Sequence, residues 1–332
     1  MVHGGDGALG QLDFSSGVAP FPPPPSILEA YRAADLTRYP HPTALPLRQA
    51  IAAHEQLSVE QVVAGHGSVE LIWALARAFV GAGRRALVLT PAFGEYQQAI
   101  RASGGQWLEL RADPPDLSWS LDRLATLLAK TQPALVFLGR PSNPCLTGAP
   151  DGALDELARR FPEILFAIDE AYLPLFEGLT AVRPQPNIAL LRSLTKVFAL
   201  PGLRLGYLTA DAAVARAVQV ALPPWNVSQP AQRAGLAAVD ELRQIPEIRS
   251  AVARLRRNLV TVLRHAGASV EREGGPFVLC RVQSAARASC RLAEHNIRVR
   301  DCTSFGLPHH LRIGIRPEHE QRALASAFRE IA

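Results

Sequence analysis

Residues 193–207 read SLTKVFALPGLRLGY and combine a lysine with residues that can bind a phosphate. It follows the apolar run Ile188–Leu191, which predicts a buried strand. Lys196 stands between hydroxyl residues and a turn that contains Arg204. Ser193 and Arg204 have the hydrogen-bonding groups that bind phosphate oxygens, and glycine allows close backbone approach. The pattern favours a lysine that forms a Schiff base beside a phosphate; the alternative is a solvated lysine on a surface loop.

Lysine is rare in this chain. The 35 basic residues include only Lys130 and Lys196, and the others are arginine. An amine can lose its proton and attack a carbonyl, whereas a guanidinium stays protonated. The chemistry of Lys196 is therefore expected to be specific to an amine.

Bulk composition restricts the class of protein. The 332 residues suit one large domain and a smaller one, and a composition of 48% hydrophobic and 20% charged residues is typical of a soluble globular protein. No apolar run reaches membrane-spanning length and no basic-then-apolar leader opens the chain, so we expect a cytoplasmic protein without a membrane partner. The four scattered cysteines indicate reduced thiols and no metal site. The net charge of +5 is spread out, which favours anionic small molecules over nucleic acid.

Apolar runs alternate with helical patterns between Val62 and about Leu208. We predict strands that alternate with helices, and this alternation indicates an α/β fold with a mainly parallel sheet and helices on both faces. The predicted strands are Ala86–Leu89, Ala134–Leu138, Leu165–Ile168 and Ile188–Leu191, and the predicted helices are Val69–Phe79, Tyr96–Ser103, Leu121–Lys130 and Asp151–Arg160. Ligands of such sheets lie beyond the carboxyl ends of the strands.

The remainder of the chain predicts a second, α+β unit. Its expected elements are a helical stretch interrupted near Pro246, strands at 277–282, 297–299 and 310–315, and helices at 285–295 and 318–331. We therefore divide the chain into an N-terminal segment 1–35 that packs with the small domain, a large domain 36–225 and a small domain 226–332.

The S-x-x-K…G-x-R-x-G pattern of residues 193–206 resembles the fold-type-I pyridoxal-phosphate enzymes, the aspartate aminotransferase superfamily. The resemblance implies a pyridoxal-phosphate-binding large domain and a small domain. It also implies that Lys196 carries pyridoxal 5'-phosphate and that Ser193 and Arg204 bind its phosphate.

Two further residues follow the predicted strand 165–168. The resemblance assigns Asp169 to the pyridine nitrogen and Tyr172 to the ring hydroxyl. A buried carboxylate keeps such a nitrogen protonated, which makes the ring an electron sink. Taken alone, an Asp-Glu pair after a strand is as typical of a helix cap.

Residues 140–148, RPSNPCLTG, resemble the family's N-P-x-N-P-T-G turn. The match implies that Asn143 bonds the ring hydroxyl. Arg140 stands where the family has its first asparagine, and the spacing between Pro144 and Thr147 is longer than in the family.

Three other sites complete the predicted cofactor set. Gly67, Ser68 and Val69 open a helix whose free N–H groups suit a phosphate. Phe93 matches the aromatic residue that stacks on the ring, although a core position is the alternative. Tyr39 matches a tyrosine that reaches the phosphate of the neighbouring subunit, which implies a homodimer.

Arginines near the C-terminus provide candidates for substrate binding. Arg312 and Arg316 lie four residues apart on the predicted strand 310–315 and its extension, so we expect them to share one face. Arg312 matches the family's substrate-carboxylate arginine. We assign Arg316 to a second anionic group, with a solvated position as the alternative.

Segments along the whole chain narrow the resemblance to one branch. They resemble the threonine-phosphate decarboxylases of cobalamin biosynthesis, in which the segment around His3 lies over the substrate phosphate. The segments are residues 3–5, 12–15, 38–42, 47–52, 223–225 and 299–305. The expected reaction is decarboxylation of L-threonine O-3-phosphate to (R)-1-amino-2-propanol O-2-phosphate by a carboxy-lyase. The alternatives are an aminotransferase, such as histidinol-phosphate aminotransferase, and a cofactor-binding regulator or inactive homologue. The expected partner is a phosphorylated amino-acid substrate.

Overall fold

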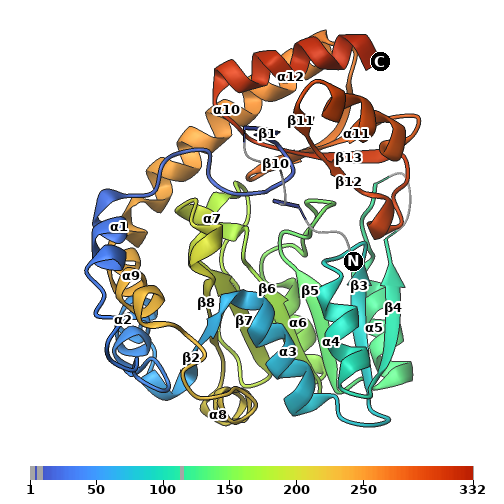
Figure 1. The fold of residues 1–332 in the computed structure, drawn as a ribbon. Coiled ribbons are helices and arrows are strands. Elements are labelled where there is room, and N and C mark those ends of the chain that lie inside the picture. The colour runs from blue at the N-terminus through green and yellow to red at the C-terminus, as the bar shows by residue number, and fades with distance from the viewer. Residues whose placement is uncertain (1–3, 6–9, 113–115, 332) are drawn as a thin grey trace.

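The computed structural model describes residues 4–5, 10–112 and 116–331. A seven-stranded sheet with helices on both faces forms the lower part of the molecule in Figure 1, and a smaller four-stranded sheet lies above it. The predicted α/β fold with a smaller α+β unit is therefore confirmed.

The large sheet has the strand order β2-β8-β7-β6-β5-β3-β4. Within the described residues β8 alone runs against the other strands, since it pairs antiparallel with both β2 and β7. We predicted four of these strands, and β2, β4 and β8 were missed. The bounds are β2 (Val62–His66), β3 (Arg85–Thr90), β4 (Gln106–Arg111), β5 (Leu135–Gly139), β6 (Leu165–Asp169), β7 (Ile188–Ser193) and β8 (Leu205–Thr209).

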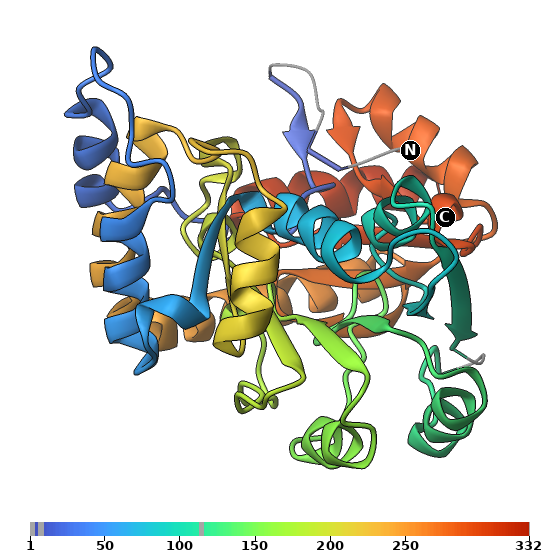
Figure 2. The ribbon, with the colours of Figure 1, turned by 90° about the horizontal axis from the view of Figure 1, so that it is seen from below.

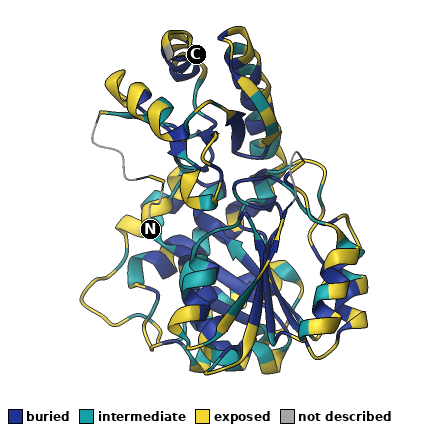
Figure 3. Cartoon of the chain, turned by 90° about the vertical axis from the view of Figure 1, so that its right-hand side faces the viewer, coloured by how far each residue is buried: buried dark blue, intermediate teal, exposed yellow. Residues whose placement is uncertain are grey.

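Alternating side chains of the strands build two cores. Val88 and Phe137 pack on one face with α3, α4 and α8, whereas Leu87 and Val136 pack on the other face with α5 and α6. This period of two follows from the pleat of a strand. Figure 3 shows the strands buried between partly exposed helices. The bounds are α3 (Gly67–Phe79), α4 (Glu95–Ala102), α5 (Leu121–Thr131), α6 (Ala153–Arg160) and α8 (Ala212–Val220).

The small sheet has the order β12-β13-β10-β9 and is antiparallel throughout. Its strands are β9 (Ser269–Gly274), β10 (Phe277–Arg281), β12 (Arg300–Asp301) and β13 (His310–Gly314), with α11 (Ala285–Glu294) and α12 (Glu318–Ile331). We did not predict β9. The strand predicted at 310–315 ends at Gly314, and this shorter strand changes the place of Arg316 described below.

Helices at one side join the N-terminal segment to the later part of the chain. In Figures 1 and 2, α1 (Pro25–Arg32) lies against α9 (Gln229–Asp240), with α2 (Leu45–Glu55) beside them. The interruption predicted at Pro246 is present, because a 3₁₀ turn precedes α10 (Ile245–His265) and the proline occupies its first turn.

The N-terminal strand β1 (Leu12–Asp13) pairs parallel with β11 (Ile297–Arg298) of the later part of the chain. Phe14 continues this contact, since its carbonyl accepts from the N–H of Gly314 at 2.6 Å. The division into segment 1–35, large domain 36–225 and small domain 226–332 stays a proposal.

Candidate active site

A cavity opens at the carboxyl ends of β5, β6 and β7, which is where a mainly parallel sheet places its ligands. The structure brings together every predicted cofactor residue except Tyr39. The lining residues are Gly67, Ser68, Val69, Phe93, Tyr96, Gly139, Pro141, Asn143, Asp169, Ala171, Tyr172, Ser193, Thr195, Lys196 and Arg204. The individual roles assigned to these residues stay predictions.

The N-terminus of α3 forms one wall of the cavity. Gly67 has φ +75°, and a Cβ there would lie 2.5 Å from Nη2 of Arg204. Gly206 lies against the same helix start, because a Cβ added there would lie 2.6 Å from the backbone nitrogen of Ser68. Free N–H groups at a helix start, with a guanidinium beside them, fit a phosphate dianion. This crowded, glycine-dependent wall fits the phosphate of the predicted cofactor.

Asp169 ends β6 inside the cavity. Its carboxylate accepts hydrogen bonds from the Tyr96 hydroxyl at 2.8 Å and from the Ala171 N–H at 2.9 Å. Burial raises the pKa of Asp169 above its usual value, while these hydrogen bonds and the positive charge of Lys196 oppose the rise. A buried carboxylate is stabilised by a cation. The protonated ring nitrogen of pyridoxal phosphate fits this requirement.

Sequence reasoning missed Tyr96, which holds Asp169. Burial, followed by the charge of Asp169, raises the pKa of Tyr96 well above its usual value, so its hydroxyl stays a hydrogen-bond donor. The ring stacks on Phe137 with centroids 5.2 Å apart and meets Phe93 edge to face at 5.9 Å. The spacing of three residues from Phe93 was a usable signal, because residues i and i+3 of a helix start share a face.

Lys196 lies in α7 (Leu194–Val197), which directly follows β7. Its Nζ lies 5.7 Å from the centre of the Tyr172 ring. The carbonyl of Lys196 accepts from the N–H of Ala19 at 2.9 Å. The N-terminal segment therefore packs directly against the turn that carries the lysine.

Asn143 connects the cavity to Arg312 of β13. Nη1 of Arg312 donates to Oδ1 of Asn143 at 2.5 Å, and Nη2 donates to the carbonyl of Ser15 at 2.6 Å. Arg312 is buried, and its Nε has no partner among the described residues. The guanidinium also lies over the Phe277 ring at 5.0 Å. A buried, oriented arginine of this kind suits a carboxylate.

The longer turn between Pro144 and Thr147 closes on itself and reaches the small sheet. Ser142 N–H donates to the Thr147 carbonyl at 2.7 Å, and their hydroxyls lie 2.8 Å apart. Cys145, at the tip, packs in an apolar cluster with Leu279 and residues from the 302–307 region. Burial raises the pKa of the Cys145 thiol to about 12, so the thiol is not a nucleophile at neutral pH.

The prediction that Arg316 shares a face with Arg312 is wrong. The strand ends at Gly314, and the Arg316 side chain turns to helix α12, where Nε donates to Glu320 at 2.8 Å. This is an i,i+4 ion pair on the outside of the site. Arg316 does not line the cavity.

Arg312 and Tyr39 also do not line the cavity. His3 is outside the described residues; its neighbour Gly4 lies against Ser15 and Arg312. Tyr39 is 85% exposed and its ring stands 5.4 Å from that of Trp225. The assignment of Tyr39 to a neighbouring subunit stays a prediction.

The described part of the chain holds no helix long and apolar enough to cross a membrane. Within that part of the chain, no group of three or more His, Cys, Asp or Glu side chains is placed to bind a metal ion.

Comparisons with known proteins agree with this geometry. Residues 10–331 match the model of the family "Aminotransferase class I and II". The chain is 32% identical to a histidinol-phosphate aminotransferase of Jannaschia sp. over 95% of this chain and 90% of the relative. It is 34% identical to the enzyme of the same name from Anaeromyxobacter sp., over 92% and 87% respectively.

Solved structures show the same fold. Histidinol-phosphate aminotransferase from Sinorhizobium meliloti in complex with pyridoxal-5'-phosphate has a TM-score of 0.87 at 24% identity, covering 96% of this chain and 89% of that one. L-Threonine-O-3-phosphate decarboxylase from Porphyromonas gingivalis has a TM-score of 0.82 at 22% identity, covering 96% and 99%.

These relatives correct the expected reaction. The curated sequences that match over nine-tenths of this chain at 32–34% identity are named histidinol-phosphate aminotransferases, whereas the decarboxylase shares the fold. The prediction of a cobalamin-pathway carboxy-lyase is therefore wrong. The cofactor residues are common to both reactions, and the segments that suggested the decarboxylase branch did not identify the reaction. The chain belongs to the aminotransferase class I and II family and uses pyridoxal 5'-phosphate as its cofactor.

Proposed function

We propose that this protein is an aminotransferase that moves an amino group between histidinol phosphate and 2-oxoglutarate. The observation that carries the proposal is the set of relatives named histidinol-phosphate aminotransferase, which align with more than nine-tenths of the chain. The cavity supports it, because a phosphate cradle, a lysine and a buried carboxylate meet there.

When bound, pyridoxal phosphate supplies an electron sink that stabilises negative charge on the substrate carbon. Asp169 holds the positive charge of the ring nitrogen, and Tyr96 orients that carboxylate. Lys196 would provide the amine, Nζ, that removes the proton from the substrate carbon bearing the amino group and holds it for the transfer. Arg312 binds an anionic group of the substrate, and Asn143 fixes one of its nitrogens.

The direct test supplies the purified protein with histidinol phosphate and 2-oxoglutarate and measures glutamate. We expect catalytic turnover with both substrates and a single stoichiometric conversion when the keto acid is omitted. Carbon dioxide release from threonine phosphate without a keto acid, or no glutamate from any phosphorylated amine, contradicts the proposal.

Arg312→Lys is expected to raise the KM for 2-oxoglutarate by about 10-fold or more, because an ammonium replaces a planar fork on a carboxylate. Steady-state kinetics with each substrate varied in turn measure the effect. Arg316→Lys is the matched comparison in the same segment, and it should leave KM unchanged because that side chain pairs with Glu320. Equal effects of the two substitutions would remove Arg312 from the substrate site.

We also propose that the protein acts as a homodimer in which Tyr39 completes the neighbouring cofactor site. Tyr39 is 85% exposed. Leu36, three residues earlier in the sequence, and Trp225, whose ring lies beside that of Tyr39, also expose apolar surface. Light scattering should give twice the monomer mass. Tyr39→Phe should weaken cofactor retention while the dimer persists, since only the hydroxyl is removed. A monomer that retains cofactor and full activity contradicts this arrangement.

A further inference from the structure

Arg140 is a guanidinium buried directly behind the cavity. Its side chain is 1% exposed, and it begins the turn after β5. The backbone N–H of Arg140 donates to the carbonyl of Asp169 at 2.8 Å. A buried guanidinium is costly unless its donors are satisfied. Its partners therefore indicate what the side chain does.

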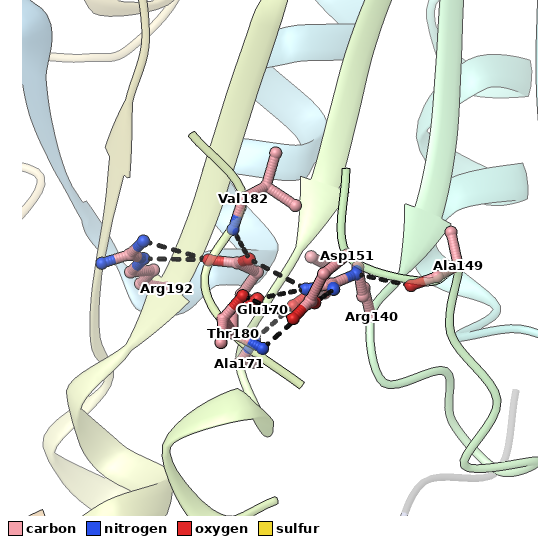
Figure 4. Close-up of polar contacts among 9 residues, drawn as sticks. Arg140, Ala149, Asp151, Glu170, Ala171, Thr180, Val182 and Arg192 are labelled. Carbon is pink, nitrogen blue, oxygen red and sulfur yellow. Dashed lines mark hydrogen bonds and ion pairs between the residues drawn. The ribbon is translucent and has the colours of Figure 1, made fainter. Parts of the chain in front are cut away.

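Those partners come from two loops. Nε of Arg140 donates to the Ala149 carbonyl at 3.0 Å, Nη1 donates to the Thr180 carbonyl, and Nη2 donates to Asp151 (Figure 4). Asp151 in turn accepts from the Thr180 hydroxyl at 2.7 Å. One side chain thus joins the loop after β5 to the loop after β6.

The Arg140 side chain also ends a series of alternating charges, in which Arg140 and Glu170 are buried and the other two members are partly exposed. Glu170 lies between Arg192 at 3.0 Å and Arg140 at 3.9 Å, and its carboxylate accepts from the Val182 N–H at 2.9 Å. Arg192 continues to Glu55 at 2.7 Å. Burial raises the pKa of Glu170, and the arginines oppose the rise. Asp169 faces the cavity, whereas Glu170, the next residue, faces these arginines. The ion pairs of Glu170 therefore hold the end of β6, where Asp169 lies.

The turn that Arg140 anchors carries Asn143. Arg140 begins the turn, and its guanidinium binds the carbonyl of Ala149 at the far end. Between these two ends, the hydroxyls of Ser142 and Thr147 contact each other. Asn143 projects from this closed turn into the cavity and accepts from Arg312. A displacement of about 1 Å at such a residue costs about 10²-fold in rate, because reacting groups must be held in one geometry.

We propose that Arg140 is a positioning residue that fixes Asn143, and through it Arg312, for the aminotransfer reaction. Its effect on turnover rests on the proposed function. Arg140 stands where the family that this sequence resembles has asparagine. An asparagine side chain is too short to bind the carbonyls of both Ala149 and Thr180, as Arg140 does. In this chain the arginine and the longer turn therefore occur together.

The test compares Arg140→Lys, which keeps a charge but loses the fork, with Arg140→Met, which keeps much of the volume and loses the charge. Arg159→Met is the matched control, because Arg159 is exposed on the nearby helix α6. The holoenzymes are compared by thermal melting, by the pH midpoint of the visible cofactor band, and by kcat and KM.

We expect the pH midpoint of the visible cofactor band to rise by about 0.5–1 unit in Arg140→Lys. A displaced Asn143 would lose its hydrogen bond to the ring hydroxyl oxygen of the cofactor, and that oxygen would then keep more negative charge beside the proton whose loss changes the band. The KM for 2-oxoglutarate should rise by about 10-fold, and more than kcat falls. Arg159→Met should match the unmodified protein in each measurement.

A lower melting temperature with unchanged midpoint and unchanged KM would overturn the proposal, because it would show a purely structural role. If Arg140→Met does not fold, Arg140→Lys decides the matter by the same two readouts. The band midpoint requires no turnover. Absence of aminotransferase activity in the unmodified protein would therefore reject the proposed function, while the midpoint would still test Arg140.

Discussion

Replacement of Lys196 by alanine is expected to lower kcat by about 10³-fold or more and to remove the visible band of the lysine-bound cofactor. General acid–base catalysis by one positioned side chain contributes about 10²–10⁴-fold, and Lys196 also provides the covalent attachment. The variant should fold, because α7 is a short turn and the Lys196 side chain lines the cavity, where Nζ approaches the Tyr172 ring and the charge of Asp169. Absorbance spectra and glutamate formation measure the two effects.

Lys130→Ala is the matched control, since Lys130 is the other lysine of the chain and lies near the end of α5. It should leave both the band and kcat unchanged. Retention of the band in Lys196→Ala, or its loss in Lys130→Ala, would show that the cofactor is attached elsewhere.

Replacement of Asp169 by asparagine is expected to lower kcat by about 10²–10³-fold, which corresponds to about 2.7–4 kcal/mol of transition-state stabilisation. The amide has the shape of the carboxylate but does not hold the ring nitrogen in its charged form. Tyr96→Phe should give a smaller loss, because it removes one hydrogen bond to Asp169 and leaves the charge.

Cofactor content measured in the same samples separates catalysis from loading. With equal loading, kcat should decrease in the order unmodified protein, Tyr96→Phe, Asp169→Asn. A fully loaded Asp169→Asn enzyme with unchanged kcat would exclude the assigned role of this carboxylate.

The sequence predicted the place of the site because the geometry of a parallel sheet is general. Asn143, Asp169 and Lys196 each follow a buried apolar run, and strands that run side by side bring such residues to one edge. Two of the strands were missed because their pattern is weak: β4 carries mixed polar residues, and β8 is interrupted by Gly206.

Side-chain partners far apart in sequence were not predictable. Tyr96 and Asp169 lie 73 positions apart, and Arg140 meets Thr180 across 40. Arg316 was misplaced because Pro317 follows it and a helix begins at Glu318, which turns the chain away from the strand direction. The reaction was misassigned because cofactor residues are shared between decarboxylation and aminotransfer, and the choice depends on which substrate bond stands perpendicular to the ring.

The apolar contact between the tip of the turn at Cys145 and the small sheet has a thermal consequence. Hydrophobic association weakens on cooling and responds little to ionic strength, in contrast to exposed ion pairs. Cys145, Leu279 and Leu307 form this contact through apolar side chains. Cooling is thus expected to weaken the apolar part of the contact between the small sheet and the turn that carries Asn143, and to leave the hydrogen bond from Arg312 to Asn143 in place.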